Sequence, residues 1–224
     1  MKATRTPRVK ICCIGSVDEA ALAIDCGASA LGLVSTMPSG PGVIGDDQIA
    51  EIAATIPPAI GIFLLTSRQR VAEIVEQQRF CRPNTIQICD HLTAGTHRDL
   101  KTELPGISIV QVIHVTGPES VEEAARVAPE VDAILLDSGN QKLPVKELGG
   151  TGRLHDWTLS REIRERIGAP MFLAGGLIPE NVEQAIGAVG PFGLDVCSGV
   201  RTDGKLDAGK LKRFFAAVRR ASSQ

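Results

Sequence analysis

The chain has 224 residues, of which 43% are hydrophobic and 22% are charged, proportions typical of a globular protein with one large core and not of a disordered tail. Its formal net charge is -2, so no excess of positive charge attracts nucleic acid or an anionic membrane, and we expect neither as a partner. With no tyrosine, one tryptophan and six phenylalanines, the sequence also has few aromatic rings from which to build a base-stacking surface.

Short apolar runs alternate with longer amphipathic segments from residue 9 onward. Eight runs rich in Ile, Val and Leu have the length of buried strands, at residues 9–14, 30–34, 60–65, 85–89, 107–113, 133–137, 170–174 and 193–197. Eight amphipathic segments predict helices, at residues 18–26, 46–56, 68–79, 96–103, 118–127, 158–167, 179–188 and 207–220. Asp18 and Asp46 open acidic first turns, and Ser67 predicts a helix start at Arg68.

Alternating strands and helices predict a parallel sheet, because parallel neighbours need crossover connections. Eight units in 224 residues are about 28 residues each, which suits an α/β fold of the compact (β/α)8 TIM barrel type. An open doubly wound sheet is the alternative. No linker divides the sequence, so we expect one domain over residues 1–224. Residues 138–156 are too long and too polar for a plain strand-to-helix turn, whereas residues 36–45 are expected to be a simple loop.

The six cysteines are predicted to be reduced thiols, because a chain of this length has core enough without disulfide staples. No Cys-x-x-Cys or His-x-x-x-His pair occurs, so no metal site is expected. The basic N-terminal stretch leads into too few apolar residues for a signal sequence or a membrane span, which predicts a cytoplasmic protein. The cysteines are Cys12, Cys13, Cys26, Cys81, Cys89 and Cys197.

Five segments at the expected strand ends together resemble one enzyme family. They read Val-Lys-Ile-Cys-Cys-Ile-Gly at 9–15, Asp-Ala-Ile-Leu-Leu-Asp-Ser at 132–138, Gly-Gly-Thr-Gly at 149–152 before Asp156-Trp157, Leu-Ala-Gly-Gly-Leu at 173–177 and Leu-Asp-Val-Cys-Ser-Gly-Val at 194–200. In this order and spacing, the chain resembles the phosphoribosylanthranilate isomerase family of tryptophan biosynthesis over nearly its whole length.

The resemblance implies an Amadori rearrangement of an N-(5-phosphoribosyl) aminoaldose to the aminoketose by general acid–base catalysis, without a metal or an organic cofactor. The partner would be a phosphorylated small-molecule substrate, and the chain a monomer or a homodimer. The reaction needs an acid that protonates the ribose ring oxygen and a base that removes a proton from the adjacent carbon. The residues that match these roles are Asp137 as acid and Cys12 as base.

Both roles need perturbed pKa values. A thiol needs a nearby positive charge to become a thiolate at neutral pH, and Lys10 lies on the same strand face as Cys12. Asp137 needs a raised pKa to remain a proton donor, and Leu135-Leu136 supply apolar neighbours in sequence. Taken alone, Cys12 reads equally as a small core residue and Asp137 as a cap, and it is their joint placement in matching motifs that favours catalysis.

The phosphate is expected at glycine-rich turns after the seventh and eighth strands, where backbone N–H groups are accessible. Taken singly, each glycine cluster is also consistent with an ordinary turn. The matching phosphate-binding residues are Gly150, Gly175, Gly176, Ser198 and Gly199. Those matching a substrate-binding role are Lys10, Gln87 and Asp195.

Three segments depart from the family pattern. Cys13 stands where the family has glycine, residues 38–42 replace a Ser-Pro-Arg segment whose arginine contacts the anthranilate carboxylate, and Gln87 is the only polar residue kept after the fourth strand. Lys142 or Lys146 in the long sixth loop could replace the missing charge, or they could simply be solvated.

These departures leave two alternatives beside the phosphoribosylanthranilate isomerase. One is a divergent isomerase of another phosphorylated aminoaldose that lacks a carboxylate. The other is a non-catalytic barrel that binds a phosphorylated metabolite. A metal-dependent epimerase is less favoured because the four histidines show no ligand spacing, and His114, although it could face the barrel mouth, reads as a hydrogen-bonded core residue.

Overall fold

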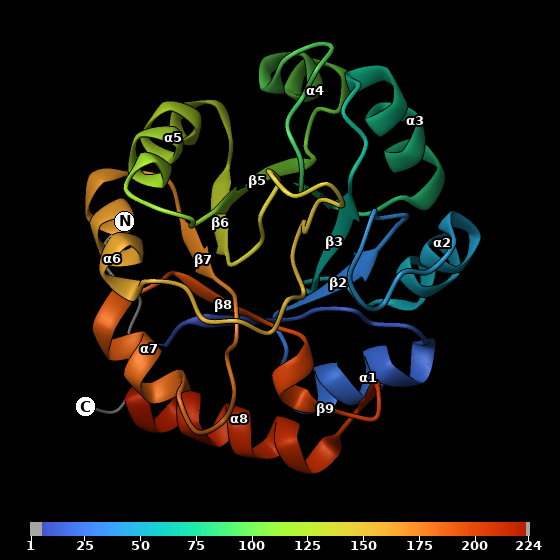
Figure 1. Cartoon of the computed structure of the whole chain (residues 1–224). Helices are drawn as coiled ribbons and strands as arrows, with labels where there is room; N and C mark the ends of the chain where they lie inside the picture. Colours follow the sequence, from blue (N-terminus) through green and yellow to red (C-terminus); the bar gives the residue numbers. More distant parts are fainter. Residues whose placement is uncertain (1–5, 223–224) are drawn as a thin grey trace.

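Eight parallel strands close into a barrel with helices packed around it (Figure 1). The structure is a computed structural model that describes residues 6–222. The strands follow one another around the barrel in sequence order, and the last pairs with the first to close it. They are β1 (Arg8–Ile11), β2 (Ala30–Val34), β3 (Gly61–Thr66), β4 (Thr85–Ile88), β5 (Ser108–His114), β6 (Ala133–Asp137), β7 (Met171–Leu173) and β8 (Gly193–Val196).

A helix follows each strand and covers the outside of the barrel. The helices are α1 (Val17–Asp25), α2 (Asp46–Thr55), α3 (Val71–Cys81), α4 (His97–Glu103), α5 (Glu119–Val127), α6 (Trp157–Arg166), α7 (Val182–Val189) and α8 (Ala208–Ala221). Short 3-10 turns lie at η1 (Ala128–Glu130) and η2 (Ser198–Val200), and a small hairpin is formed by β9 (Arg201–Thr202) and β10 (Lys205–Leu206). The predicted (β/α)8 barrel is therefore confirmed, and the open sheet is wrong.

Most helix starts follow the local sequence signals. The Ser16 hydroxyl accepts the N–H of Glu19 at the start of α1, and the acidic first turns of α1 and α2 are present. The predicted start after Ser67 is wrong, because α3 begins at Val71. Ser67 instead donates a hydrogen bond to the carbonyl of Thr36 at 2.7 Å, so its hydroxyl joins two loops and caps no helix.

Side chains alternate between the two faces of each strand and build two packed regions. Outward-facing residues such as Ile11 and Leu31 pack against the helices. Inward-facing residues fill the barrel, where Phe63 and Phe172 meet edge to face with ring centroids 5.7 Å apart. The same alternation turns Lys10 and Asp137 inward, and it thereby places polar groups inside an apolar barrel.

The loops at the carboxyl ends of the strands cover one mouth of the barrel. The longest, residues 138–156, runs across the middle of the barrel in Figure 1, and Asn140 and Glu147 exchange backbone hydrogen bonds at 2.9 and 3.0 Å to form a hairpin at its base. The irregular character predicted for this segment is thus confirmed. Within residues 6–222, no helix is both long enough and apolar enough to span a bilayer.

Candidate active site

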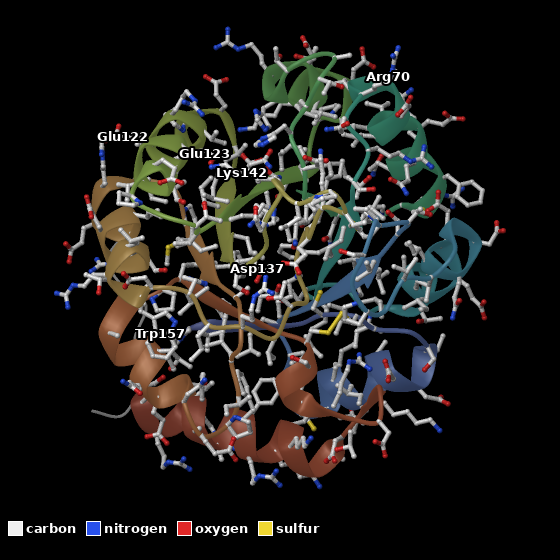
Figure 2. The ribbon with its side chains drawn as sticks, viewed as in Figure 1. Arg70, Glu122, Glu123, Asp137, Lys142 and Trp157 are labelled. Atoms are coloured by element: carbon white, nitrogen blue, oxygen red, sulfur yellow. A yellow bond between two sulfur atoms is a disulfide. The ribbon has the colours of Figure 1, made fainter. Side chains whose placement is uncertain are left out.

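A cavity opens at the carboxyl ends of the strands, in the mouth that the long loop partly covers. Its space is about 680 Å³ including the open mouth, within the range of small-molecule sites. Figure 2 shows Asp137 near the centre of the ring, while Glu122 lies at the outer edge. The predicted residues that line the cavity are Cys12, Gln87, Asp137, Gly150, Gly175, Gly176, Asp195 and Ser198. Two others do not line it: Lys10 is fully buried beneath it, and Gly199 packs against the Leu177 carbonyl.

Lys10 forms a buried ion pair at the base of the cavity. Because β1 and β8 are neighbours in register, Lys10 lies opposite Asp195, and its Nζ is 2.9 Å from Asp195 Oδ1. The same Nζ donates to Cys12 Sγ at 3.7 Å and lies 5.2 Å from the ring centroid of Phe63. Burial by itself lowers the pKa of Lys10, but the attraction and hydrogen bond of Asp195 together with the nearby Cys12 and Cys89 raise it by more, so the ammonium stays charged beneath the thiol.

Lys10 does not ionise the Cys12 thiol in the empty cavity. Burial raises the pKa of Cys12 to about 11, Lys10 lowers it and the negative charge of Asp195 raises it again. Lys10 lies beside the thiol as strand alternation predicts and lowers its pKa, but burial together with Asp195 outweighs this effect. A thiolate at Cys12 needs further positive charge in the cavity.

Asp137 is the acidic group with the raised pKa that its predicted role requires. Burial raises its pKa to about 6, the backbone N–H of Ser138 lowers it, and the negative charge of Asp195 raises it. Ser138 donates that hydrogen bond to Oδ1 at 2.7 Å. Of the two leucines expected to surround it, Leu135 is turned inward with it and Leu136 packs outward against the helices. About half of Asp137 is thus protonated at pH 6 and about a tenth at pH 7.

The glycine-rich segment of the long loop lies directly over Asp137. Gly149 has φ of +136°, and a Cβ added there would lie 2.6 Å from Asp137 Oδ2. The hydroxyl groups of Ser138 and Thr151 are 2.7 Å apart and tie this segment to the end of β6. Only bare backbone allows so close an approach, so the loop covers the carboxyl group and contributes to its burial.

Two glycines after β7 and a serine after β8 form the wall of the cavity that lies across from β3 and β4. Gly175 and Gly176 follow β7, and Ser198 starts η2 after β8. The loop that carries Gly150 closes over them from above. This wall presents backbone and one hydroxyl group, which is the kind of surface that binds phosphate oxygens.

Gln87 brings an unused polar atom to the far side of the cavity. Its side chain is 3% exposed, its Nε2 contacts Cys89 Sγ at 3.7 Å, and its Oε1 is buried without a hydrogen bond from any described residue. A buried acceptor of this kind is available to a ligand donor.

Three further candidates, His114, Lys142 and Lys146, do not line the cavity and contact other parts of the chain. His114 Nε2 lies 3.1 Å from the carbonyl oxygen of Cys89, which fits the core role. Lys142 is 81% exposed and lies 3.8 Å from Glu119. Lys146 Nζ lies 2.6 Å from Asp90 Oδ2, and that carboxylate is 5% exposed. Neither lysine lines the cavity.

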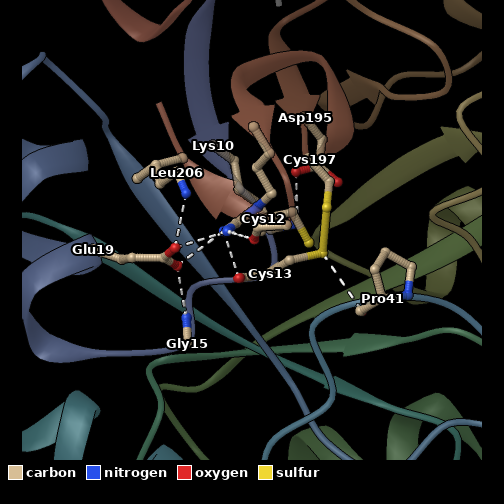
Figure 3. The surroundings of a disulfide bond; sticks show 11 residues. Lys10, Cys12, Cys13, Gly15, Glu19, Pro41, Asp195, Cys197 and Leu206 are labelled. Atoms are coloured by element: carbon tan, nitrogen blue, oxygen red, sulfur yellow. Dashed lines mark hydrogen bonds and ion pairs between the residues drawn. A yellow bond between two sulfur atoms is a disulfide. The ribbon is translucent and has the colours of Figure 1, made fainter. Parts of the chain in front are cut away.

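Cys13 and Cys197 form a disulfide with Cα atoms 6.0 Å apart (Figure 3), so the prediction of reduced thiols is wrong for this pair. The two residues are 184 positions apart in sequence but follow the paired strands β1 and β8. Chain length indicates only whether a core needs a disulfide for stability. It does not indicate that closure of the barrel places these two thiols side by side. The free cysteines are Cys12, Cys26, Cys81 and Cys89.

Protein purified without reductant and then unfolded is expected to show four reactive thiols, and six after reduction. A thiol-reactive chromophore measures both counts. The variant Cys197→Ser should show five before reduction, because Cys13 then loses its partner. Six thiols in the unreduced wild-type protein would contradict the disulfide.

A partly buried ion pair that the sequence motifs do not indicate holds the turn after β1. Arg201, 9% exposed, donates to both carboxylate oxygens of Glu19 at 2.8 and 3.1 Å and to the carbonyls of Cys12 and Cys13 at 3.3 and 2.5 Å. Burial raises the pKa of Glu19, but hydrogen bonds from Arg201, Leu206 and Gly15 together lower it by more, so the carboxylate is charged. This pair supports Cys13, whose φ of 63° is uncommon for a residue with a side chain.

Residues 36–45, expected to be a simple loop, form one wall of the cavity through Met37, Ser39, Gly40 and Pro41. Two departures from the family pattern also meet here. Gly42 has φ of +75°, and a Cβ added there would overlap the Cβ of Cys13. A side chain at position 42 would therefore collide with the side chain of Cys13, so a cysteine at position 13 is compatible with glycine at position 42.

Within residues 6–222, no group of three or more His, Cys, Asp or Glu side chains is arranged to hold a metal ion. The cavity brings together the carboxyl group of Asp137, the thiol of Cys12 and glycine-rich turns that expose backbone. Such a set is suited to proton transfer on a phosphorylated ligand.

Comparison with known proteins gives a consistent result. The family model described as N-(5'phosphoribosyl)anthranilate (PRA) isomerase matches residues 9–217. An N-(5'-phosphoribosyl)anthranilate isomerase of Methanocella arvoryzae is 33% identical over 213 residues, which cover 95% of this chain and 98% of the relative.

Solved structures of similar proteins agree with the fold and with the kind of ligand. The phosphoribosyl anthranilate isomerase from Thermococcus kodakaraensis matches with a TM-score of 0.78 and 31% identity, covering 95% of this chain and 99% of that one. Another phosphoribosyl anthranilate isomerase, in complex with reduced 1-(o-carboxyphenylamino)-1-deoxyribulose 5-phosphate, matches with a TM-score of 0.76 and 27% identity, covering 96% and 99%.

Proposed function

The chain belongs to the N-(5'-phosphoribosyl)anthranilate isomerase family, and from this premise we propose that Asp137 and Cys12 are the acid and the base of its reaction. The activity is the isomerisation of N-(5'-phosphoribosyl)anthranilate in tryptophan biosynthesis. The observation that carries the proposed roles is that a buried carboxyl group with a raised pKa and a buried thiol line the same cavity.

Asp137 opens the sugar ring. Its carboxyl proton passes to the ribose ring oxygen while the bond from that oxygen to the first ribose carbon breaks, which leaves a protonated imine and an aspartate anion. The pKa of about 6 suits this donor, because a weaker acid transfers its proton less readily and a stronger acid is fully ionised near neutral pH.

Cys12 then removes a proton from the second ribose carbon. The electron pair of that bond forms a carbon–carbon double bond as the imine nitrogen loses its positive charge, and the resulting enol tautomerises to the aminoketose. The cationic imine supplies the positive charge that the empty cavity lacks, so it lowers the pKa of Cys12 from about 11 at the step that needs a thiolate.

The remaining residues bind and orient the substrate. The phosphate is assigned to the wall of Gly175, Gly176, Ser198 and Gly150, and Gly199 supports the η2 turn. Gln87 Oε1 accepts a hydrogen bond from a substrate hydroxyl or amine. Lys10 and Asp195 act from below, where their ion pair sets the charge around the thiol.

The protein is proposed to work in the cytoplasm as a monomer or a homodimer with no nucleic-acid partner. The biosynthetic activity supports this location. The cytosol keeps most thiols reduced. The thiol count described above therefore also tests whether the bond between Cys13 and Cys197 is present in protein made there.

The purified protein is expected to convert N-(5'-phosphoribosyl)anthranilate, seen as loss of anthranilate-type fluorescence. Its gene should also restore growth of a tryptophan auxotroph that lacks the isomerase. A rate no higher than that of the uncatalysed rearrangement, together with failed complementation, would contradict the activity.

A further inference from the structure

The end of the cavity away from the phosphate wall is apolar. Because strands follow one another around the barrel, β2 to β4 lie across from β7 and β8. The long loop adds Leu148 to the wall on this side. With the phosphate at the glycine turns, this end receives the arylamine of the substrate. The apolar residues that line it are Val34, Met37, Pro41, Leu65 and Leu148.

The charged residues that line the cavity within the described part of the chain are Asp137 and Asp195. Both are acidic, and above pH 6 Asp137 is largely ionised. Neither aspartate lies on the strands of the apolar end, so a carboxylate on the arylamine meets no cation among the described residues that line the cavity there. The polar side chains on that side are Ser39, whose hydroxyl donates to the Lys146 carbonyl at 2.7 Å, and Gln87, whose Nε2 contacts Cys89 Sγ at 3.7 Å.

Each cation near the cavity is already held by a carboxylate of this chain. Lys10 pairs with Asp195 at 2.9 Å, and Arg201 pairs with Glu19. Arg153 forms an exposed ion pair with Glu147, and its backbone lies against Gly175 and Gly176 at the phosphate wall, across from the apolar end. Lys10 is also fully buried beneath the cavity floor.

Lys146 stands beside the apolar end, two residues before Leu148, and its carbonyl accepts the hydroxyl of Ser39 at 2.7 Å. Its Nζ is 2.6 Å from Asp90, whose carboxylate is 5% exposed. Moving this amine to a substrate would leave Asp90 buried without its ion pair, which is strongly unfavourable. Lys146 therefore neutralises Asp90 and does not serve a ligand.

Resting on the proposed function, we infer that this cavity binds the arylamine by its apolar ring and takes phosphoribosyl arylamines whether or not the ring carries a carboxylate. The chemical class of substrate is thus N-(5-phosphoribosyl) arylamines in general. The phosphate and ribose set the position of the reacting carbons, and the ring fills the apolar end.

The test compares substrates made by condensing ribose 5-phosphate with anthranilate, methyl anthranilate or aniline. The methyl ester keeps the ring and its electronic effect on the amine but removes the charge. The aminoketose products are quantified by chromatography, and the uncatalysed rate, measured without enzyme, is subtracted. We expect kcat/KM for the two neutral substrates to lie within about fivefold of the anthranilate value, because a charge-assisted anchor would separate them by about tenfold or more.

A loss of about fivefold or more for both neutral substrates would overturn the inference and leave the proposed function intact. Turnover of no substrate above the rate without enzyme would overturn the proposed function itself. The double variant Asp90→Asn/Lys146→Met removes both members of the ion pair, and Lys142→Met is its exposed control. The ratio of kcat/KM between anthranilate and ester substrates, which does not depend on the folded fraction, should stay unchanged, and a fall of about fivefold would identify Lys146 as a carboxylate anchor.

Discussion

Cys12→Ser is expected to lower kcat by about 10²- to 10⁴-fold, the usual range for removal of a general base. The serine hydroxyl is a far weaker acid than the thiol, so the cationic imine does not convert it to an anion at neutral pH. KM should change little, because the substitution keeps the size of the side chain and the phosphate wall is untouched. The measurement is steady-state turnover of N-(5'-phosphoribosyl)anthranilate by fluorescence.

Cys26→Ser is the matched control for this change, since Cys26 lies at the end of α1 and outside the cavity. It should retain the wild-type kcat. If Cys12→Ser keeps more than about a tenth of the wild-type kcat, the thiol is not the base.

Asp137→Asn is expected to lower kcat by about 10²- to 10⁴-fold and also to change the pH dependence of kcat/KM. In the wild type, protonated Asp137 is lost above pH about 6 as fast as thiolate is gained, so kcat/KM, which reports the free enzyme, levels off. Asparagine neither donates this proton nor titrates. The log of the residual kcat/KM of the variant should therefore keep rising above pH 6, by about one for each pH unit until the thiol is ionised.

The same variant should be more stable than the wild type at high pH, which separates lost chemistry from misfolding. The pKa of Asp137 is about 6 in the folded chain and 3.8 for an ordinary aspartate, so folding favours its protonated form. That contribution is full below pH 3.8 and is lost as the pH rises through 6. Asparagine keeps it, which predicts a gain of about 2–3 kcal/mol in the free energy of unfolding at pH 8 and none at pH 3.5.

Urea unfolding at several pH values measures this gain, with Asp47→Asn on the exposed start of α2 as the control. A variant that loses both activity and stability at pH 8 would show that Asp137 is needed for the fold. A wild-type kcat/KM that keeps rising above pH 6 as it does in the variant would show that another group is the acid.

Local sequence patterns predict the parts of the site that depend on strand periodicity. Alternation along β1 and past its end turns Lys10 and Cys12 to the same side, and the end of β6 places Asp137 at the mouth, so both proposed reacting groups are predictable from motifs and strand ends. Helix boundaries follow caps where the cap is local, as at Ser16, but not at Ser67, whose hydroxyl is used by a distant carbonyl.

The sequence by itself determines the barrel, because eight apolar runs and eight amphipathic segments in alternation can bury their faces together in few other ways. Only the tertiary structure decides the disulfide between Cys13 and Cys197 and the contact of Gly42 with Cys13. It also decides the pKa values of the acid and the base. These properties depend on distances between residues remote in sequence and on how much water their packing excludes, and neither quantity is encoded in a local pattern.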